Sequence, residues 1–193
     1  MPAEFFSKGS LIDGENILYT VQADLVKKLE LISVASHSSI FIIFTALYGY
    51  LLSDINGLDQ VEIQVQSLNG RDNLLSLGID TAVIKDYSDL FFRTRKKLDE
   101  ENGNKVYSLK RVLRKPLERK ENEIVPLIIN KQALNSRAGL ESVFDLVLEI
   151  NETGSTYNIE ARFNSSRLNG KMVREFMDKY VKLIGLLVQN FKY

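Results

Sequence analysis

Three segments of the chain alternate between apolar and polar residues, the pattern of a β-strand with one buried face. The clearest is Gln60 to Gln66, where Val61, Ile63 and Val65 share one face. Phe144 to Ile150 and Tyr157 to Phe163 show the same alternation on either side of Glu152-Thr153-Gly154-Ser155, which predicts a hairpin. β-branched and aromatic composition predicts further strands at Ile17 to Val21, at Thr81 to Ile84 and, interrupted by Pro126, at Ile124 to Ile129.

Other segments repeat apolar residues every three or four positions, which places them on one side of an α-helix. The longest is Met172 to Phe191, a predicted amphipathic helix that closes the chain. Ser39 to Leu52 is apolar almost throughout but too short to cross a bilayer, so we predict a buried helix that begins at a serine cap. We expect further helices at Asp24 to Ser33, Tyr87 to Glu101 and Tyr107 to Leu117.

The strands and helices together predict an α/β fold with two-layer (α+β) packing. Residues 1 to 16 show little pattern, so we interpret them as a leading arm or linker and residues 17 to 193 as one folded unit. Asn69 to Leu77 is interpreted as a polar loop.

The charge balance argues against the partners that a strongly charged chain attracts. Lysine plus arginine and aspartate plus glutamate each number 25, so no bulk field draws the chain toward nucleic acid or a membrane. The sequence has no cysteine, which fits a reducing compartment, and we expect a cytoplasmic protein.

The chain offers little material for catalysis. It has one histidine, His37, and no cysteine, so histidine-based, cysteine-based and zinc-based chemistry are not expected. A histidine that acts as a general base needs an orienting partner and a pocket, and the local sequence around His37 offers no carboxylate. We therefore interpret His37 as a surface residue near a helix start, and we predict no catalytic residue and no metal site.

Two stretches, Val34 to Arg71 and Phe144 to Arg167, carry motifs that resemble those of the C-terminal lobe of the condensation domains of nonribosomal peptide synthetases. Val34 to Arg71 is similar to the family's helix followed by a strand that ends in a loop with asparagine and arginine. Phe144 to Arg167 is similar to the closing hairpin, with Phe-Asp-Leu followed by Glu-Thr-Gly. Between them, Leu75 to Lys85, Asn104 to Arg111 and Arg119 to Leu127 keep parts of three further family motifs.

The resemblance implies half of a two-lobe domain. Each lobe in the family has a chloramphenicol-acetyltransferase-like fold, a mixed sheet with helices packed on it. An acceptor amine attacks a donor thioester, both held on carrier proteins by phosphopantetheine arms. A histidine of the N-terminal lobe's His-His-x-x-x-Asp-Gly signature assists, and this sequence has no such signature. The resemblance therefore implies a lobe that is inactive alone and binds no cofactor directly. Its implied partners are the N-terminal lobe, peptidyl or acyl carrier proteins and adjacent synthetase modules.

The same resemblance suggests residues for the wall of the acyl tunnel. Asp80 and Thr81 match family positions that face the cleft between the lobes, although a solvated strand edge explains them equally well. Gln66 and Ser67 end a strand at a place suited to hydrogen-bonding a substrate amide or a pantetheine arm. Strand termination and turn formation offer a simpler explanation for these two residues.

A basic run lies in the predicted helix after these positions. Its residues are Arg93, Arg95, Lys96 and Lys97, with Lys110, Arg111, Arg114 and Lys115 further on. Such a run suits either an acidic carrier protein or a solvated helix face. Acidic neighbours such as Asp89 and Glu100 dilute the positive charge, which favours the solvated face.

The sequence is consistent with two functions. The first is the C-terminal lobe of a condensation-type domain in nonribosomal peptide or hybrid polyketide biosynthesis. The alternative is a stand-alone, non-catalytic interaction module that binds a partner lobe or a carrier protein. A trimeric chloramphenicol-type acetyltransferase is a poor fit, because it needs a histidine motif near the C-terminus and residues 150 to 193 contain no histidine. A surface that normally meets another lobe is expected to expose apolar residues, so we also expect self-association.

Overall fold

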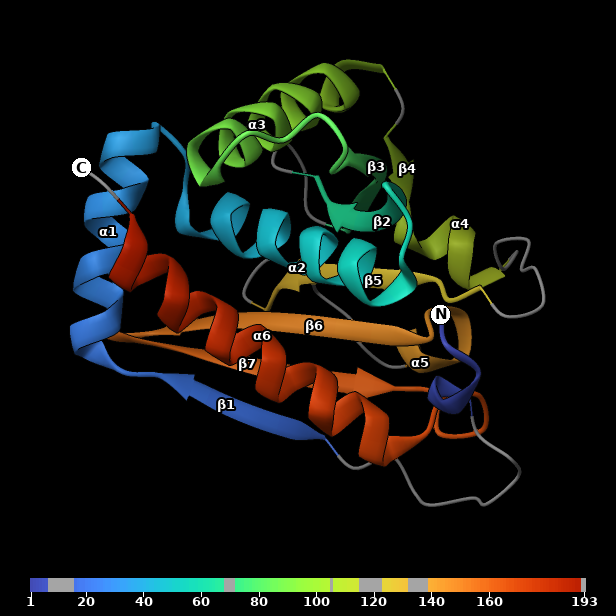
Figure 1. Ribbon diagram of the computed structural model, residues 1–193. Coiled ribbons are helices and arrows are strands. Elements are labelled where there is room, and N and C mark those ends of the chain that lie inside the picture. The colour runs from blue at the N-terminus through green and yellow to red at the C-terminus, as the bar shows by residue number, and fades with distance from the viewer. Residues whose placement is uncertain (7–15, 68–71, 105, 115–122, 132–138, 192–193) are drawn as a thin grey trace.

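The computed structural model describes residues 1–6, 16–67, 72–104, 106–114, 123–131 and 139–191. The strands of this part of the chain form one seven-stranded sheet in the order β1-β7-β6-β5-β2-β3-β4 (Figure 1). Two neighbouring pairs, β2 with β5 and β5 with β6, are parallel, and the other pairs are antiparallel. The mixed sheet with helices packed on it confirms the predicted fold class.

The strands are β1 (Ile17–Val21), β2 (Gln60–Gln66), β3 (Asn73–Asp80), β4 (Tyr107–Ser108), β5 (Pro126–Asn130), β6 (Leu146–Thr153) and β7 (Thr156–Phe163). The helices are α1 (Ala23–Ser36), α2 (Ile40–Asn56), α3 (Tyr87–Asn104), α4 (Leu109–Arg114), α5 (Leu140–Val143) and α6 (Gly170–Asn190), with a short 3-10 helix η1 (Ala3–Phe5). No single described helix is long and apolar enough to cross a membrane, and α1 and α2 pass that test only as a pair bent by 92°.

The two faces of the sheet are covered unequally. On the face called here the helix face, α2 and α6 lie across the strands and bury the main core (Figure 1). On the opposite face, called here the second face, α4 and α5 cover a smaller apolar cluster that includes Leu74, Leu127, Ile129 and Val147. Because side chains alternate along a strand, the polar residues of β2, β3, β6 and β7 also fall on the second face.

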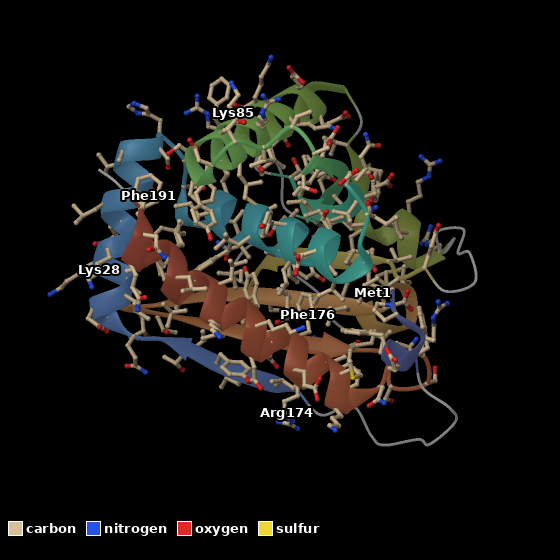
Figure 2. All side chains as sticks on the ribbon, in the orientation of Figure 1. Met1, Lys28, Lys85, Arg174, Phe176 and Phe191 are labelled. Carbon is tan, nitrogen blue, oxygen red and sulfur yellow. The ribbon has the colours of Figure 1, made fainter. Side chains whose placement is uncertain are left out.

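The central helix α2 confirms the prediction of a buried helix. The Ser39 side chain caps its first turn by accepting a hydrogen bond from the Ile42 backbone N–H at 3.3 Å. Gly57 ends the helix at φ 60°, a conformation that glycine adopts without strain. Phe176 of α6 points into this core (Figure 2), with its ring centroid 5.9 Å from that of Tyr48 and 6.3 Å from that of Phe5.

Two buried tyrosines link α6 to α2 and α2 to the sheet. The Tyr180 hydroxyl donates to the Phe44 carbonyl at 2.8 Å, and the Tyr48 hydroxyl donates to the Leu146 carbonyl at 3.2 Å. Burial raises the pKa of both phenols well above the ordinary value of 10.0. These residues therefore remain protonated in the fold at a pH where an unfolded chain ionises them.

The buried tyrosines predict a specific loss of stability in alkaline solution. The pKa of each tyrosine is higher in the folded than in the unfolded protein. The stabilisation that the protonated phenols give the folded state is therefore complete below about pH 10 and is lost as the pH rises further. We expect the free energy of unfolding to fall above about pH 10 by up to about 1.4 kcal/mol per pH unit for each tyrosine. Urea unfolding at pH 9, 10 and 11 measures this slope, and Tyr180→Phe should make it shallower. An equal slope in that variant would contradict the assignment.

Gly49 allows α2 to pack closely against β3. A methyl group at this position would overlap the Cδ1 atom of Ile79 and lie 3.1 Å from its Cγ1 atom. We expect Gly49→Ala to destabilise the fold by about 1–2 kcal/mol, because overpacking outweighs the better helix propensity of alanine. Ile79→Val removes the overlapping carbon, so Gly49→Ala should be neutral or stabilising in that background. Thermal unfolding of the four proteins in this double-mutant cycle measures the coupling, and a coupling near zero would contradict it.

The sequence misplaced one strand. We predicted a polar loop up to Leu77 and a strand at Thr81 to Ile84, but β3 ends at Asp80 and Thr81 to Ile84 contains a turn. The reason is pairing: β3 lies antiparallel to β2 along its full length and buries Leu74, Leu75 and Leu77. Because Leu74 and Leu75 are adjacent and both apolar, the sequence of β3 lacks the apolar–polar alternation typical of a strand.

The bounds of most other predicted elements lie within a few residues of those observed, but Tyr107–Ser108 forms the strand β4 and not the start of a helix, and α5 was not predicted. Pro126 begins β5 instead of interrupting a strand, a position that proline tolerates because it lacks an N–H. Only Leu109–Arg114 of the predicted helix at 107 to 117 is described as helical, and residues 115 to 117 lie outside the described part. In the predicted leading arm, Phe5 is buried, while residues 7–15 lie outside the described part.

Candidate functional site

The four predicted tunnel residues lie at the two ends of the β2–β3 pair. Gln66 stands opposite Leu74 in the ladder, and Asp80 stands opposite Gln60. Six residue-to-residue steps of extended strand separate these two pairs, a distance of roughly 20 Å. The structure therefore brings Gln66 next to Ser67 and Asp80 next to Thr81, but it does not join the two pairs into one small site.

Gln66 and Ser67 are buried and hydrogen-bonded within the lobe. The Gln66 Oε1 atom accepts from the backbone N–H of Asn130 at 2.8 Å, which links β2 to the end of β5. The Ser67 hydroxyl donates to Asn102 Oδ1 at 2.7 Å, which links the same strand end to α3. Both side chains thus fix the place where β2 ends.

Asp80 and Thr81 point in different directions. The Asp80 carboxylate accepts from Gln60 Nε2 at 3.1 Å and from the Ala82 N–H at 3.2 Å. The Thr81 hydroxyl lies 2.7 Å from the Ser53 hydroxyl of α2 and donates to the Asp59 carbonyl at 3.1 Å. Asp80 shares the second face with Gln66, whereas Thr81 turns toward the helix layer.

Between these ends, the second face carries a connected row of polar side chains, called here the polar strip: Glu62, Gln64, Ser76 and Tyr107. The Tyr107 hydroxyl donates to Gln64 Oε1, and the Gln64 amide donates to the Ser76 hydroxyl at 3.3 Å. The Ser76 hydroxyl in turn donates to Glu62. The alternation in β2 indicated that Glu62 and Gln64 share a face, but no local signal connects Tyr107 to them.

Tyr107 serves this strip as a hydrogen-bond donor. Burial raises the pKa of Tyr107 well above its ordinary value, and the nearby Glu62 carboxylate raises that pKa further. The phenol therefore keeps its proton at neutral pH and does not act as a base.

A second group of charges lies further along the same face, over β6 and β7. Arg162 pairs with Glu149 at 2.9 Å and also with Glu141 of α5. Lys131 pairs with Glu160 at 3.1 Å. The Glu149 side chain is only 1% exposed, and the nearby guanidinium offsets part of the cost of burying the carboxylate. Sequence reasoning did not single out these residues.

His37 has a structural place in the fold. It ends α1 in the left-handed conformation at φ 51°, and its backbone carbonyl accepts a hydrogen bond from Arg95. The exposed residue lies between the end of α1 and the start of α2, away from the polar strip, which confirms the prediction of a surface residue near a helix start.

Arg93, Arg95, Lys96 and Lys97 of the basic run lie on α3 beside the Asp80 end of β3. Lys110, Arg111 and Arg114 lie on α4, and Lys115 lies outside the described part. Arg93, Lys96 and Lys97 line a groove of about 320 Å³ together with Gly78 and Asp80. The structure thus places basic residues of α3 beside Asp80, a predicted tunnel residue.

The described residues can position a substrate but offer little for bond making. The polar strip provides amide, hydroxyl and carboxylate groups, and no histidine or cysteine lies in it. No three metal-binding side chains come together in the part of the chain that the structure describes. The arrangement supports hydrogen-bonding and orientation of a neutral or amide-containing ligand.

Comparison with known proteins gives a likeness in structure but not in sequence. No family model and no curated protein matches the sequence. The SgcC5 protein from Streptomyces globisporus has 15% identity and a TM-score of 0.75, over 96% of this chain and 51% of that chain. The EpoB cyclization-docking bidomain of a nonribosomal peptide synthetase from Sorangium cellulosum has 12% identity and a TM-score of 0.70, over 94% of this chain and 43% of that chain.

A third solved structure agrees with these two. The first condensation domain of the CDA synthetase has 11% identity and a TM-score of 0.69, over 94% of this chain and 47% of that chain. In each case almost all of this chain matches about half of the solved one. The protein therefore has the chloramphenicol-acetyltransferase-like fold of one lobe of a condensation-type domain.

Proposed function

We propose that this chain is the C-terminal lobe of a condensation-type domain in nonribosomal peptide or hybrid polyketide biosynthesis. The observation that carries the proposal is the match of nearly the whole chain to about half of two-lobe proteins. The order of the sequence motifs supports the C-terminal assignment. The missing half, an N-terminal lobe, is the first partner that the proposal requires.

The second face of the sheet is the wall that this lobe contributes to the acyl tunnel. It is the face that helices cover least, and its polar strip lies between the predicted tunnel residues Gln66 and Asp80. A glutamine amide has two N–H groups and two acceptor lone pairs. Gln64 uses both N–H groups on Glu62 and Ser76, so one lone pair is left to it, whereas Gln66 uses one lone pair on the Asn130 N–H and retains the capacity to donate. That capacity suits the amide groups of a pantetheine arm or of a peptidyl substrate.

The role of this wall is to hold two tethered substrates together. Carrier proteins deliver a donor thioester and an acceptor amine, each on a phosphopantetheine arm, and the arms enter the tunnel as parts of the substrates. Orienting the two reacting groups lowers the barrier by several kcal/mol without any catalytic group from this lobe. The imidazole that handles the proton belongs to the N-terminal lobe.

The stand-alone interaction module is the second candidate. One observation favours it: the hydroxyls of Ser67 and Thr81, two of the predicted tunnel residues, are hydrogen-bonded within this lobe. An interaction module needs only a docking surface, and the expected self-association would use the same surface.

Complex formation with an N-terminal lobe tests the proposal. The lobe that carries the His-His-x-x-x-Asp-Gly signature in the same synthetase is produced separately and mixed with this chain. We expect a one-to-one complex by native mass spectrometry, together with amide-exchange protection of Gln64 and Ser76 on the second face. A complex that protects only the helix layer would contradict the assigned wall, and the absence of any complex would contradict the lobe assignment.

A further inference from the structure

The outer edge of β3 is unpaired over most of its length. β4 pairs with β3 only at Asn73 and Leu74, so the edge from Leu75 to Asp80 has no strand beside it in the described part of the chain. An unpaired strand edge is a template for another extended segment.

The hydrogen-bonding groups on this edge can be assigned from the ladder with β2. The Ser67 N–H donates to the Asn73 carbonyl at 2.8 Å, and the Thr81 N–H donates to the Asp59 carbonyl at 2.7 Å. Bonded pairs alternate along an antiparallel ladder, so the odd-numbered residues of β3 bond to β2. The N–H and C=O groups of the even-numbered residues point to the opposite edge.

Three even-numbered residues therefore offer free backbone groups. The Asp72 carbonyl, at the start of the same edge, accepts from the Leu109 N–H at 2.8 Å, which confirms the direction. Further along, no described residue hydrogen-bonds the backbone N–H or C=O of Ser76, Gly78 or Asp80 on this side.

The groove described above lies along this edge, with α3 as its other wall. Leu90, Arg93, Thr94 and Lys97 lie on one side of α3 and line it, and Ile79, Val83 and Ile84 add apolar surface. A strand edge that faces a helix across a groove is the arrangement in which peptides bind by strand addition.

Lys97 sets the charge of the groove. A methyl group added at Gly78 would lie 3.1 Å from the Lys97 ammonium, so the absence of a side chain at Gly78 leaves room for this charge over the strand edge. Arg93 pairs with Asp89 at 2.8 Å, and Lys96 lies 3.9 Å from Glu100. Lys97 forms no ion pair with any described residue, and the Asp80 carboxylate is held by Gln60 and Ala82.

We propose that this groove binds an acidic, extended segment of a partner protein, which adds as a strand to the edge of β3. The main chain of the segment bonds to Gly78 and Asp80, and a carboxylate of the segment pairs with Lys97. A short apolar side chain of the segment contacts Val83 and Ile84. This inference stands on the groove alone and does not depend on the condensation proposal.

Two fluorescein-labelled octapeptides test the inference, one of alternating aspartate and valine and one of alternating lysine and valine. We expect the acidic peptide to bind with an anisotropy change that weakens at higher salt, and the basic peptide not to bind. Lys97→Glu should weaken binding of the acidic peptide at least tenfold. Lys182→Glu, a charge reversal at an exposed residue of α6, should leave it within twofold.

Gly78→Pro separates strand addition from simple charge attraction. Proline removes the outward N–H of residue 78 but leaves the bonds between β2 and β3, so the fold should persist while binding falls at least tenfold. Gly78→Ala keeps the N–H and should stay within threefold. If the proline variant unfolds, amide exchange on the parent protein decides, because strand addition slows exchange at Gly78 and Asp80.

The contradictory results are equally specific. Failure of the acidic peptide to bind would overturn the proposal. Binding that Lys97→Glu abolishes but Gly78→Pro does not change, or that leaves exchange at Gly78 and Asp80 unaltered, would overturn strand addition.

Discussion

Replacement of Arg162 by methionine is expected to lower the free energy of unfolding by about 3 kcal/mol. The change removes the guanidinium that pairs at 2.9 Å with Glu149, a carboxylate that is only 1% exposed. A buried charge that loses an ion-pair partner costs far more than the pair contributes when intact. The value lies at the lower end of the usual range because the Arg162 side chain is 20% exposed. Urea unfolding with a fitted midpoint and slope measures the loss.

Two further variants separate this explanation from a general loss of packing. The double variant Arg162→Met with Glu149→Leu removes both charges and should recover to within about 1 kcal/mol of the parent protein. Lys171→Met breaks a pair of exposed side chains, Lys171 and Glu175 at 3.9 Å, and should change stability by less than about 0.5 kcal/mol. A double variant no more stable than Arg162→Met alone would contradict the buried-charge explanation.

The isolated chain is expected to show no condensation activity with an acyl-loaded donor carrier and an amine-loaded acceptor carrier. A positioned general acid or base accelerates a reaction about 10²–10⁴-fold. The polar strip contains no histidine to act in this way. Tyr107 does not replace one, because its raised pKa keeps the phenol protonated. A single-turnover assay that follows product on the acceptor carrier measures the rate against carriers alone.

The only histidine of the chain provides the control for that assay. His37 ends α1, away from the polar strip, so His37→Ala should leave the background rate unchanged. Turnover above background that His37→Ala abolishes would show that this chain is an enzyme by itself.

The sequence predicts those parts of the fold that depend on local pattern. The alternation of Gln60 to Gln66 leads directly to β2, because burial of one face leaves a periodic signal. The apolar run before Gly57 leads directly to α2, because burial of almost the whole surface leaves a continuous apolar stretch. β3 was not predicted as a strand, because its polar first residue and adjacent leucines do not alternate regularly between apolar and polar. Its identity as a strand comes from pairing with β2.

The candidate site was predicted only in part, for a physical reason. The Tyr107–Gln64 contact joins residues 43 positions apart, and the Arg162–Glu149 pair depends on the register between β6 and β7. Neither has a local sequence signal. The family resemblance pointed to Gln66 and Asp80, but it did not show that they lie at opposite ends of one strand pair. Likewise, only the packing of α3 against β3 places Lys97 beside Gly78.

A titration of condensation rate tests the central claim, that this chain is one lobe of a chamber whose catalytic imidazole lies in the other lobe. The N-terminal lobe with its His-His-x-x-x-Asp-Gly signature is held at fixed concentration with both loaded carriers, and this chain is added stepwise. We predict a rate that rises at least a hundredfold and saturates at a one-to-one ratio. A rate that stays at background throughout, or one that the N-terminal lobe reaches without this chain, would contradict the account.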